Sequence, residues 1–391
     1  MSKLLSIVIP TKDRYQTLFP VITNIRSQLD MSFCEIVISD NTKDNTDALS
    51  FLKKHSKDTD LVYKHTVNPL SMVENTEIAL SLAKGEYILF IGDDDFVSPY
   101  IIDVVKDLKK RNIQCLTYPI ANYFYKNVEF RKKYAFNNPA TLQVTKNSQL
   151  LYEKKRSSKE LAHICDIGAI YISGLPRLYH GIISQELLKQ LKATYGKFIP
   201  GPCPDMTISV ALALHIEEYY YLDYPVSISG ASSNSEGGKG PTNKHVVKLE
   251  DKKWLNQEDV KDWDKFIPKI FSRETIWAQC VSHVFKLHHS NYKLNYQKIY
   301  SSMIRNCPYN TFEYVKPLYF SYLKDNTQSK QLYYKDLLYR FIKRLVFIFP
   351  SILLELLVSI RGDYKRYNCI KNIDTIDECV NYLKINYKPK F

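Results

Sequence analysis

Several patterns that define common protein classes are missing from this sequence of 391 residues. Its eight cysteines are irregularly spaced and none forms a Cys-x-x-Cys pair, so we expect reduced thiols, as in a cytosolic protein, and no zinc site. The sequence contains no internal repeat and no long low-complexity tract. With 45% hydrophobic and 24% charged residues, the chain is expected to be globular rather than disordered.

A long uninterrupted hydrophobic run is also missing. The most apolar stretch, Leu345 to Val358, contains Pro350 and Glu355 and is therefore a poor membrane span. Basic residues flank it, so one interpretation places it on the surface of an anionic membrane, and the other makes it a buried helix pair. The apolar run Leu4 to Pro10 is too short for a signal peptide and predicts a strand. We therefore expect a cytoplasmic protein, with peripheral contact at the inner face of the membrane as one interpretation.

Positive charges outnumber negative ones, which gives a formal net charge of +13. Such an excess allows an anionic partner, and nucleic acid, acidic lipid and a phosphate-bearing substrate all qualify. No recognition motif for nucleic acid accompanies the charge. Charge alone therefore does not choose among these partners.

Apolar strands alternate with helical patterns in the first part of the chain. Strands are predicted at residues 4–10, 34–39, 61–67 and 87–91, with a helix after each of the first three and a further helix and strand over about 100–119. This alternation predicts an α/β fold with a Rossmann-like, mostly parallel sheet. From about residue 245 the pattern becomes basic and helical. We therefore predict two domains, residues 1–245 and a helical C-terminal domain over residues 246–391.

Three adjacent aspartates follow the most apolar of these strands. Tyr87 to Ile91 is apolar on both faces, as in a central strand of a covered parallel sheet, and Gly92 leads into Asp93, Asp94 and Asp95. Ligands of open α/β sheets collect at the carboxyl ends of strands. Crowded carboxylates repel one another unless a cation lies between them, and hard oxygen ligands suit Mg²⁺ or Mn²⁺. The pattern fits a metal-assisted site for a phosphorylated ligand, and it fits a polar turn that caps the next helix equally well.

Three segments resemble family 2 glycosyltransferases of the GT-A fold. They are Ile7 to Thr11, the strand that ends at Asp40, and Gly85 to Asp95, and their order and spacing carry the resemblance. The resemblance implies a GT-A domain that moves a sugar from a nucleotide diphosphate sugar to a hydroxyl of a saccharide or lipid-linked saccharide acceptor. It also implies a role in the synthesis of bacterial surface polysaccharide, such as capsule or lipopolysaccharide.

The resemblance assigns the donor nucleotide to residues that follow the first two strands. The loop after the first strand would contact the nucleotide through Thr11, Asp13 and Arg14. Asp40, which ends the second strand, would accept a hydrogen bond from the base.

The resemblance also places the metal motif. Gly92-Asp93-Asp94 takes the place of the Asp-x-Asp motif of the family, so its first aspartate is a glycine in this chain. Asp94 matches the second aspartate and is expected to bind Mn²⁺ or Mg²⁺. Asp93 would contact the ribose or sugar of the donor. Asp95 would bind the ion, directly or through water.

Inverting relatives place a catalytic carboxylate at the start of a helix downstream of the metal motif, and Asp205 fits that place. It would take a proton from the acceptor hydroxyl as general base, while the ion offsets the charge of the leaving diphosphate. A plain helix N-cap is the structural alternative for Asp205, and Asp166 and Glu218 are weaker candidates for the base. The loop from Gly230 to Gly240 is expected either to close over the donor or to be an unstructured surface connection.

Two other functions compete with sugar transfer. A nucleotidyltransferase also uses clustered aspartates and a metal, but it usually has a Gly-rich or basic phosphate-binding loop, and Thr11 to Arg14 contains no glycine. A basic, non-catalytic nucleic-acid-binding protein is permitted by the charge, but Asp93 to Asp95 would repel phosphate without a metal. We therefore expect sugar transfer and no nucleic-acid partner.

Overall fold

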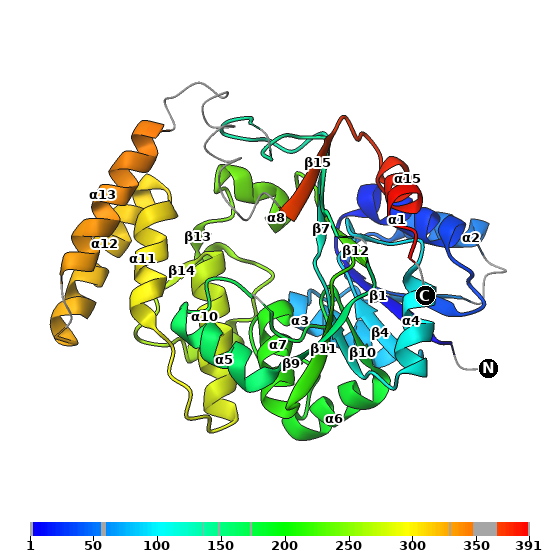
Figure 1. Cartoon of the computed structure of the whole chain (residues 1–391), viewed down its shortest axis with the longest axis horizontal. Coiled ribbons are helices and arrows are strands. Elements are labelled where there is room, and N and C mark those ends of the chain that lie inside the picture. Colours follow the sequence, from blue (N-terminus) through cyan, green and yellow to red (C-terminus); the bar gives the residue numbers. More distant parts are fainter. Residues whose placement is uncertain are drawn as a thin grey trace.

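The computed structural model describes residues 3–55, 60–134, 136–147, 149–172, 174–327, 330–346 and 366–389. Its centre is an eight-stranded sheet with the strand order β3-β2-β1-β4-β10-β6-β11-β9 (Figure 1). The strands are β1 (Leu5–Thr11), β2 (Cys34–Asp40), β3 (Leu61–His65), β4 (Tyr87–Phe90), β6 (Cys115–Thr117), β9 (Tyr152–Arg156), β10 (Gly181–Ser184) and β11 (Glu218–Leu222). Strands β1 to β4 run parallel, and β10 is antiparallel to both of its neighbours. The predicted mostly parallel α/β fold is confirmed.

Helices cover both faces of this sheet, which explains why its central strands are apolar throughout. The helices of the first half are α1 (Tyr15–Gln28), α2 (Thr46–Lys54), α3 (Met72–Leu82), α4 (Ile101–Lys110), α5 (Ser157–Asp166), α6 (Gln185–Tyr195) and α7 (Pro204–His215). Successive residues of β1 serve opposite faces: Val8 packs in a core with α3, α6 and α7, whereas Ile7 and Ile9 pack in a core with α1 and α4.

A second, five-stranded sheet lies beside the first, in the order β15-β8-β7-β12-β5. Its strands are β5 (Phe96–Val97), β7 (Ala121–Phe124), β8 (Thr141–Thr145), β12 (Ser227–Ala231) and β15 (Tyr367–Lys371). The sequence pattern also predicts a single strand over residues 219–228. This prediction is wrong, because the chain bends at residues 223–226 and its two halves, β11 and β12, join different sheets. Strand β12 pairs with β5, directly after the aspartates.

The C-terminal third is helical, as predicted, and shares a core with the N-terminal half. Helices α10 (Arg273–Leu287), α11 (Tyr296–Asn306), α12 (Tyr309–Asp325) and α13 (Gln331–Val346) form the left side of Figure 1. Short elements precede them: α8 (Glu236–Lys239), η1 (Gly240–Thr242), β13 (Val247–Lys248), η2 (Leu249–Asp251), α9 (Gln257–Lys261) and β14 (Ile270–Phe271). Buried residues of α10 and α11 belong to the same hydrophobic core as those of α7.

The end of the chain returns to the N-terminal half. Strand β15 pairs with β8, and helix α15 (Ile376–Asn386) lies beside α1, where Asn24 Nδ2 donates to Asp377 Oδ1 at 2.6 Å (Figure 1). Residues 366–389, assigned to the C-terminal domain from the sequence, therefore pack with the N-terminal unit. For the other residues, the division into two domains at residue 245 remains a prediction.

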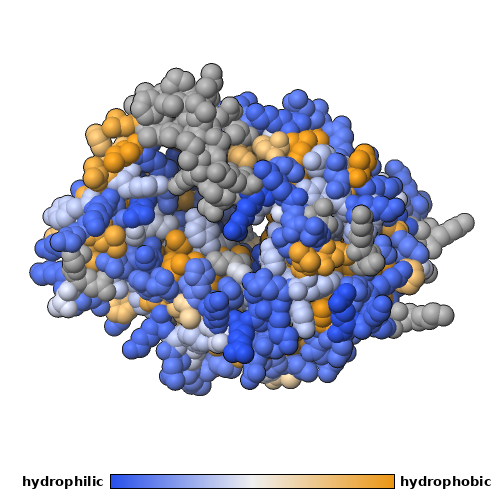
Figure 2. Space-filling view, in the orientation of Figure 1, coloured by the Kyte–Doolittle hydropathy of each residue, from blue (hydrophilic) through white to orange (hydrophobic). Residues whose placement is uncertain are grey.

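The apolar stretch Leu345 to Val358 lies, beyond Val346, outside the described residues. Hydrophobic residues gather at the C-terminal end of α13 (Figure 2), where Phe341 and Leu345 are exposed. No helix in the described part of the chain combines the length and the hydrophobicity needed to cross a membrane.

Candidate active site

A cavity of about 940 Å³ lies at the carboxyl ends of β1 and β4, where ligands of α/β sheets bind. Its lining includes Thr11 to Arg14 at the end of β1, Gly92 to Asp94 after β4, Cys203 to Asp205 at the start of α7, most of residues 234–240, and most of Ser272 to Trp277. The last two parts lie far beyond the aspartates in the sequence. The cavity is therefore built by the sheet and the C-terminal half together.

Six of the predicted site residues line this cavity, and two do not. The six are Thr11, Asp13, Arg14, Asp93, Asp94 and Asp205. Asp40 and Asp95 are almost completely buried and their side chains do not border the cavity. The fold thus brings the β1 loop, two of the three aspartates and the start of α7 together.

Arg14 joins two of the aspartates. Its Nη1 lies 2.6 Å from Asp93 Oδ1, and its Nη2 lies 2.7 Å from Asp94 Oδ2. Thr11 Oγ1 donates to the other oxygen of Asp93 at 2.7 Å. A guanidinium placed across two carboxylates relieves their repulsion. From the sequence, we expected a metal cation to do this.

Burial changes the pKa values of Asp93 and Asp94. Removal from water raises the pKa of Asp93 to about 7 against the opposing effect of Arg14, and burial also raises the pKa of Asp94. Burial opposes the charge of Arg14, but the neighbouring carboxylates outweigh it and raise the pKa of the guanidinium. The pair therefore favours additional positive charge in the cavity.

Asp95 is held by protein groups on all sides. Its Oδ2 accepts from Gly92 N at 2.6 Å and from the Tyr179 hydroxyl at 2.9 Å, and lies 3.0 Å from His180 Nε2. Its Oδ1 accepts from Gly230 N at 2.7 Å. Burial opposes ionisation, but His180 and these hydrogen bonds outweigh it and lower the pKa of Asp95. In this structure Asp95 therefore holds the turn after β4 rather than presenting oxygens to a cavity ligand.

Strand β12 closes over the aspartates from the other side. Ser232 donates to Asp94 Oδ2 from its backbone N at 3.0 Å and from its hydroxyl at 2.7 Å. A Cβ on Gly230 would lie 1.7 Å from the carbonyl oxygen of Asp94, so only glycine permits this approach. Both residues lie in the loop that the sequence singled out, but their contacts with the aspartates were not predicted, because contacts over more than 130 residues leave no local pattern.

The loop after β12, predicted as a lid or an unstructured connection, begins with a capped helical turn. Ser235 caps α8 by accepting from Gly238 N at 3.0 Å, and residues 234–240 line the cavity. The described loop is thus a structured wall of the cavity, fixed at its base by Ser232.

Asp40 is enclosed beside the cavity. Its Oδ2 accepts from the hydroxyls of Tyr15 at 2.5 Å and Tyr63 at 2.7 Å, and its Oδ1 accepts from Thr42 N at 2.8 Å. The next residue, Asn41, borders the cavity in its place, and its Oδ1 accepts from Lys12 Nζ at 2.9 Å. The base contact expected of Asp40 remains a prediction, and the structure places Asn41 nearer to the cavity.

Asp205 lies in the first turn of α7, two residues beyond the N-cap position that the sequence predicted for it. Cys203 is the N-cap and Pro204 the first helical residue. Asp205 Oδ1 accepts from Met206 N at 2.7 Å and from Cys203 Sγ at 2.9 Å, and Oδ2 accepts from Trp277 Nε1 at 2.9 Å. The carboxylate thus faces the cavity with both oxygens oriented by donors.

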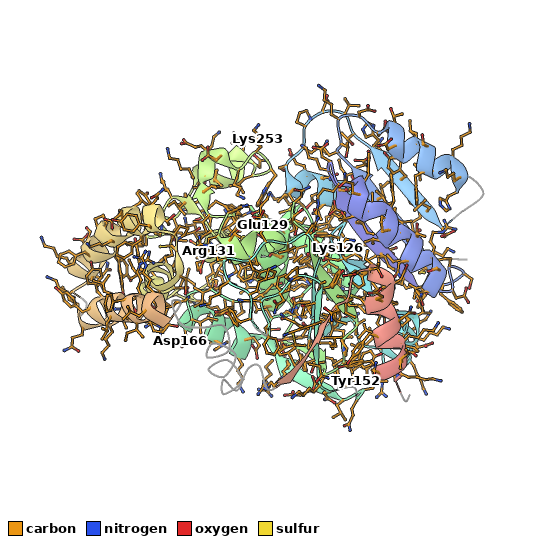
Figure 3. All side chains as sticks on the ribbon, turned by 90° about the horizontal axis from the view of Figure 1, so that it is seen from above. Lys126, Glu129, Arg131, Tyr152, Asp166 and Lys253 are labelled. Atoms are coloured by element: carbon orange, nitrogen blue, oxygen red, sulfur yellow. The ribbon has the colours of Figure 1, made fainter. Side chains whose placement is uncertain are left out.

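The two weaker candidates for the base lie elsewhere. Asp166 ends α5 and appears near the outer edge of the molecule in Figure 3. Glu218 begins β11 and pairs with Lys154 at 3.0 Å. Neither residue lines the cavity.

Two carboxylates, Asp93 and Asp94, offer oxygen atoms to a cation in the cavity. Asp93 Oδ1 is buried and makes no aligned hydrogen bond, and such an oxygen suits a hard divalent ion. Among the described residues, no group of three or more His, Cys, Asp or Glu side chains is arranged as a metal site. The donor set therefore fits a cation that also takes ligands from water or a bound phosphate, in competition with Arg14.

Part of this chain is similar to a known protein family. Residues 6–173 match the family described as Glycosyl transferase family 2. No curated protein matches the chain. Among solved structures, S. aureus TarS is 17% identical over 59% of this chain and 37% of its own, with a TM-score of 0.40, so the chain spans well under half of that protein.

Two further solved structures are similar at this level. TarS residues 1–349 in complex with UDP-GlcNAc are 17% identical over 86% of this chain and 89% of theirs, with a TM-score of 0.46. GalNAc-T7 with UDP, GalNAc and Mn²⁺ is 14% identical over 60% of this chain and 45% of its own, with a TM-score of 0.39. The family match covers β1 to β4 and the three aspartates and ends before Asp205. Residues 6–173 of this chain are therefore similar to glycosyl transferase family 2.

Proposed function

We propose that this protein transfers a sugar from a nucleotide diphosphate sugar to a hydroxyl of a saccharide or lipid-linked saccharide acceptor, with inversion at the anomeric carbon. One observation carries the proposal: Asp93 and Asp94, at the end of β4, share a cavity with Asp205, at the start of α7. Two carboxylates at one end can serve the donor phosphates, and a third can serve the acceptor hydroxyl. Bacterial surface polysaccharide as the acceptor class follows from the motif resemblance.

The donor half of the site comprises the β1 loop and the aspartates. Thr11, Asp13 and Arg14 would contact the nucleotide. Asp94 would hold Mn²⁺ or Mg²⁺ together with Asp93, which takes the place expected of Asp95 because the oxygens of Asp95 are bonded to protein groups. When bound, the ion offsets negative charge on the diphosphate as it leaves. Arg14 has a planar, bidentate guanidinium, which suits phosphate as well as carboxylate, so the donor diphosphate can take over the contacts that Arg14 makes with the aspartates.

The acceptor half of the site depends on Asp205. The acceptor oxygen attacks the anomeric carbon, the bond from that carbon to the diphosphate oxygen breaks, and Asp205 takes the hydroxyl proton. Asp205 suits this role because it faces the cavity and lies in the first turn of α7, where the helix dipole favours the charged carboxylate. Residues 234–240 border the same cavity and limit the access of water.

The proposal is tested with two variants that separate donor binding from turnover. Asp94→Asn should lose the Mn²⁺-dependent thermal shift produced by nucleotide diphosphate sugars, because the cation loses a charged ligand. Asp205→Asn should keep that shift and lose turnover with an added acceptor, by about 10²–10⁴-fold for a general base. A normal turnover rate in Asp205→Asn would overturn the base assignment, and an undiminished shift in Asp94→Asn would overturn the assignment of the donor site.

A further inference from the structure

The proposed base receives one hydrogen bond from outside its own turn of α7. Trp277 of α10 donates its indole N–H to Asp205 Oδ2 at 2.9 Å, and both residues line the cavity. The other oxygen, Oδ1, is held by Met206 N and Cys203 Sγ, which belong to the turn of Asp205 itself. Within the described residues, Trp277 is the only hydrogen-bond donor to Oδ2. A carboxylate oxygen accepts two hydrogen bonds, so Oδ2 keeps one position free for an acceptor hydroxyl.

Helix α10 is fixed against the start of α7 at two neighbouring positions. Trp277 and Cys280 lie three residues apart and so share one face of α10. Cys280 is fully buried and its Sγ approaches the carbonyl oxygen of Cys203 at 3.8 Å. Ser272 caps the helix in a reciprocal capping box with Thr275. The indole is therefore carried by a rigid element that meets the turn of Asp205.

The ring of Trp277 is also held from the cavity side. The Arg273 guanidinium lies 5.7 Å from the centre of the Trp277 ring and 4.9 Å from that of Tyr171. Both are within the distance at which a cation is attracted to an aromatic face. This contact restricts the indole to an orientation in which its N–H points at Asp205.

Among the described residues, neither of the other two tryptophans donates a hydrogen bond to a carboxylate of the cavity. Trp263 Nε1 donates to the backbone carbonyl of Ile267 at 2.9 Å and does not line the cavity. Trp254 lines the cavity and packs edge-on against Phe271. Trp263 is therefore a matched control, because its indole makes an equally short hydrogen bond away from the site.

We propose that Trp277 is a positioning residue that orients the Asp205 carboxylate toward the acceptor hydroxyl. This inference rests on the proposed role of Asp205 as general base. Without the indole donor, Oδ2 loses its fixed direction and the carboxylate turns about its side-chain bonds. Misplacement of a reacting group by about 1 Å costs about 100-fold in rate. The C-terminal helices thereby complete the acceptor half of the site.

The test is a double-mutant cycle measured on the full chain. Trp277→Phe keeps an aromatic ring and removes the N–H, and should lower kcat about 10–100-fold with a change in donor KM below about 3-fold. In the Asp205→Asn background the same change should have little further effect, because Trp277 acts through Asp205. The control Trp263→Phe should leave kcat unchanged.

Four outcomes would overturn the inference. The first is a kcat of Trp277→Phe within about 2-fold of wild type, and the second is an equal fold-loss in both backgrounds, which makes Trp277 independent of Asp205. In the third, Asp205→Asn turns over normally, so that the base assignment fails and this inference with it. Trp277→His retains a ring N–H and should be more active than Trp277→Phe, and the reverse order is the fourth. The thermal shift with nucleotide sugar and Mn²⁺ verifies that each variant is folded.

Discussion

Replacing Gly230 by alanine tests whether the close packing of β12 against the aspartates stabilises the site. A Cβ at this position would lie 1.7 Å from the carbonyl oxygen of Asp94, whereas an ordinary contact is 3.4–4 Å. The backbones must therefore separate by about 1.7 Å to admit alanine, by the difference between these distances. Such a separation breaks the bonds from Gly230 N to Asp95 at 2.7 Å and from Ser232 to Asp94 at 3.0 and 2.7 Å.

The loss of these hydrogen bonds determines how far Gly230→Ala lowers the free energy of unfolding. Each bond to a charged group contributes about 1.5–3 kcal/mol, so loss of all three corresponds to about 4–9 kcal/mol before relaxation. At about 2 °C per kcal/mol, Gly230→Ala should lower Tm by about 8 °C or more. It should also weaken the binding of nucleotide sugar, because Asp94 loses both donors from Ser232.

Gly240 provides the matched control for a thermal-unfolding assay. It has helical backbone angles, and no heavy atom lies within 4 Å of an added Cβ. Gly240→Ala should change stability by no more than about 1 kcal/mol. If Gly230→Ala unfolded within about 2 °C of wild type, the steric argument would fail.

Two further predictions concern the aspartates. Asp95→Asn should lower Tm more than Asp93→Asn. Gly92 N and the Tyr179 hydroxyl both donate to Asp95 Oδ2, and an amide NH₂ in that position could not accept from them. Equal Tm values for the two variants would contradict the structural role of Asp95. Burial raises the pKa of Asp93 to about 7, so between about pH 4 and pH 7 the folded protein binds a proton that the unfolded chain does not, and the stability from this group is lost as pH rises. Without divalent metal, the Tm of Asp93→Asn minus that of wild type should therefore become more positive from pH 5 to pH 8; a constant difference would show that Asp93 does not titrate in this range.

Much of the fold is encoded locally. Apolar strands and amphipathic helices follow from periodicities of two and about 3.6 residues, so β1 to β4 and α1, α3, α4, α6 and α7 were predictable from short windows. The place of Asp93 and Asp94 at a strand end, and of Asp205 at a helix start, followed in the same way. The boundary between β11 and β12 could not be predicted in this way, because the local pattern does not show that one half of an apolar run joins a second sheet.

The partners of the site residues were decided only by the tertiary structure. Sequence position gave no sign that Asp95 and Asp40 would have their oxygens occupied by Tyr179 and Tyr63, or that Arg14 would lie across two aspartates. Local sequence specifies which residues end strands and begin helices, because strand ends and helix starts depend on neighbours along the chain. Long-range packing decided which of them face the cavity and what holds them, since those contacts join residues tens to hundreds of positions apart.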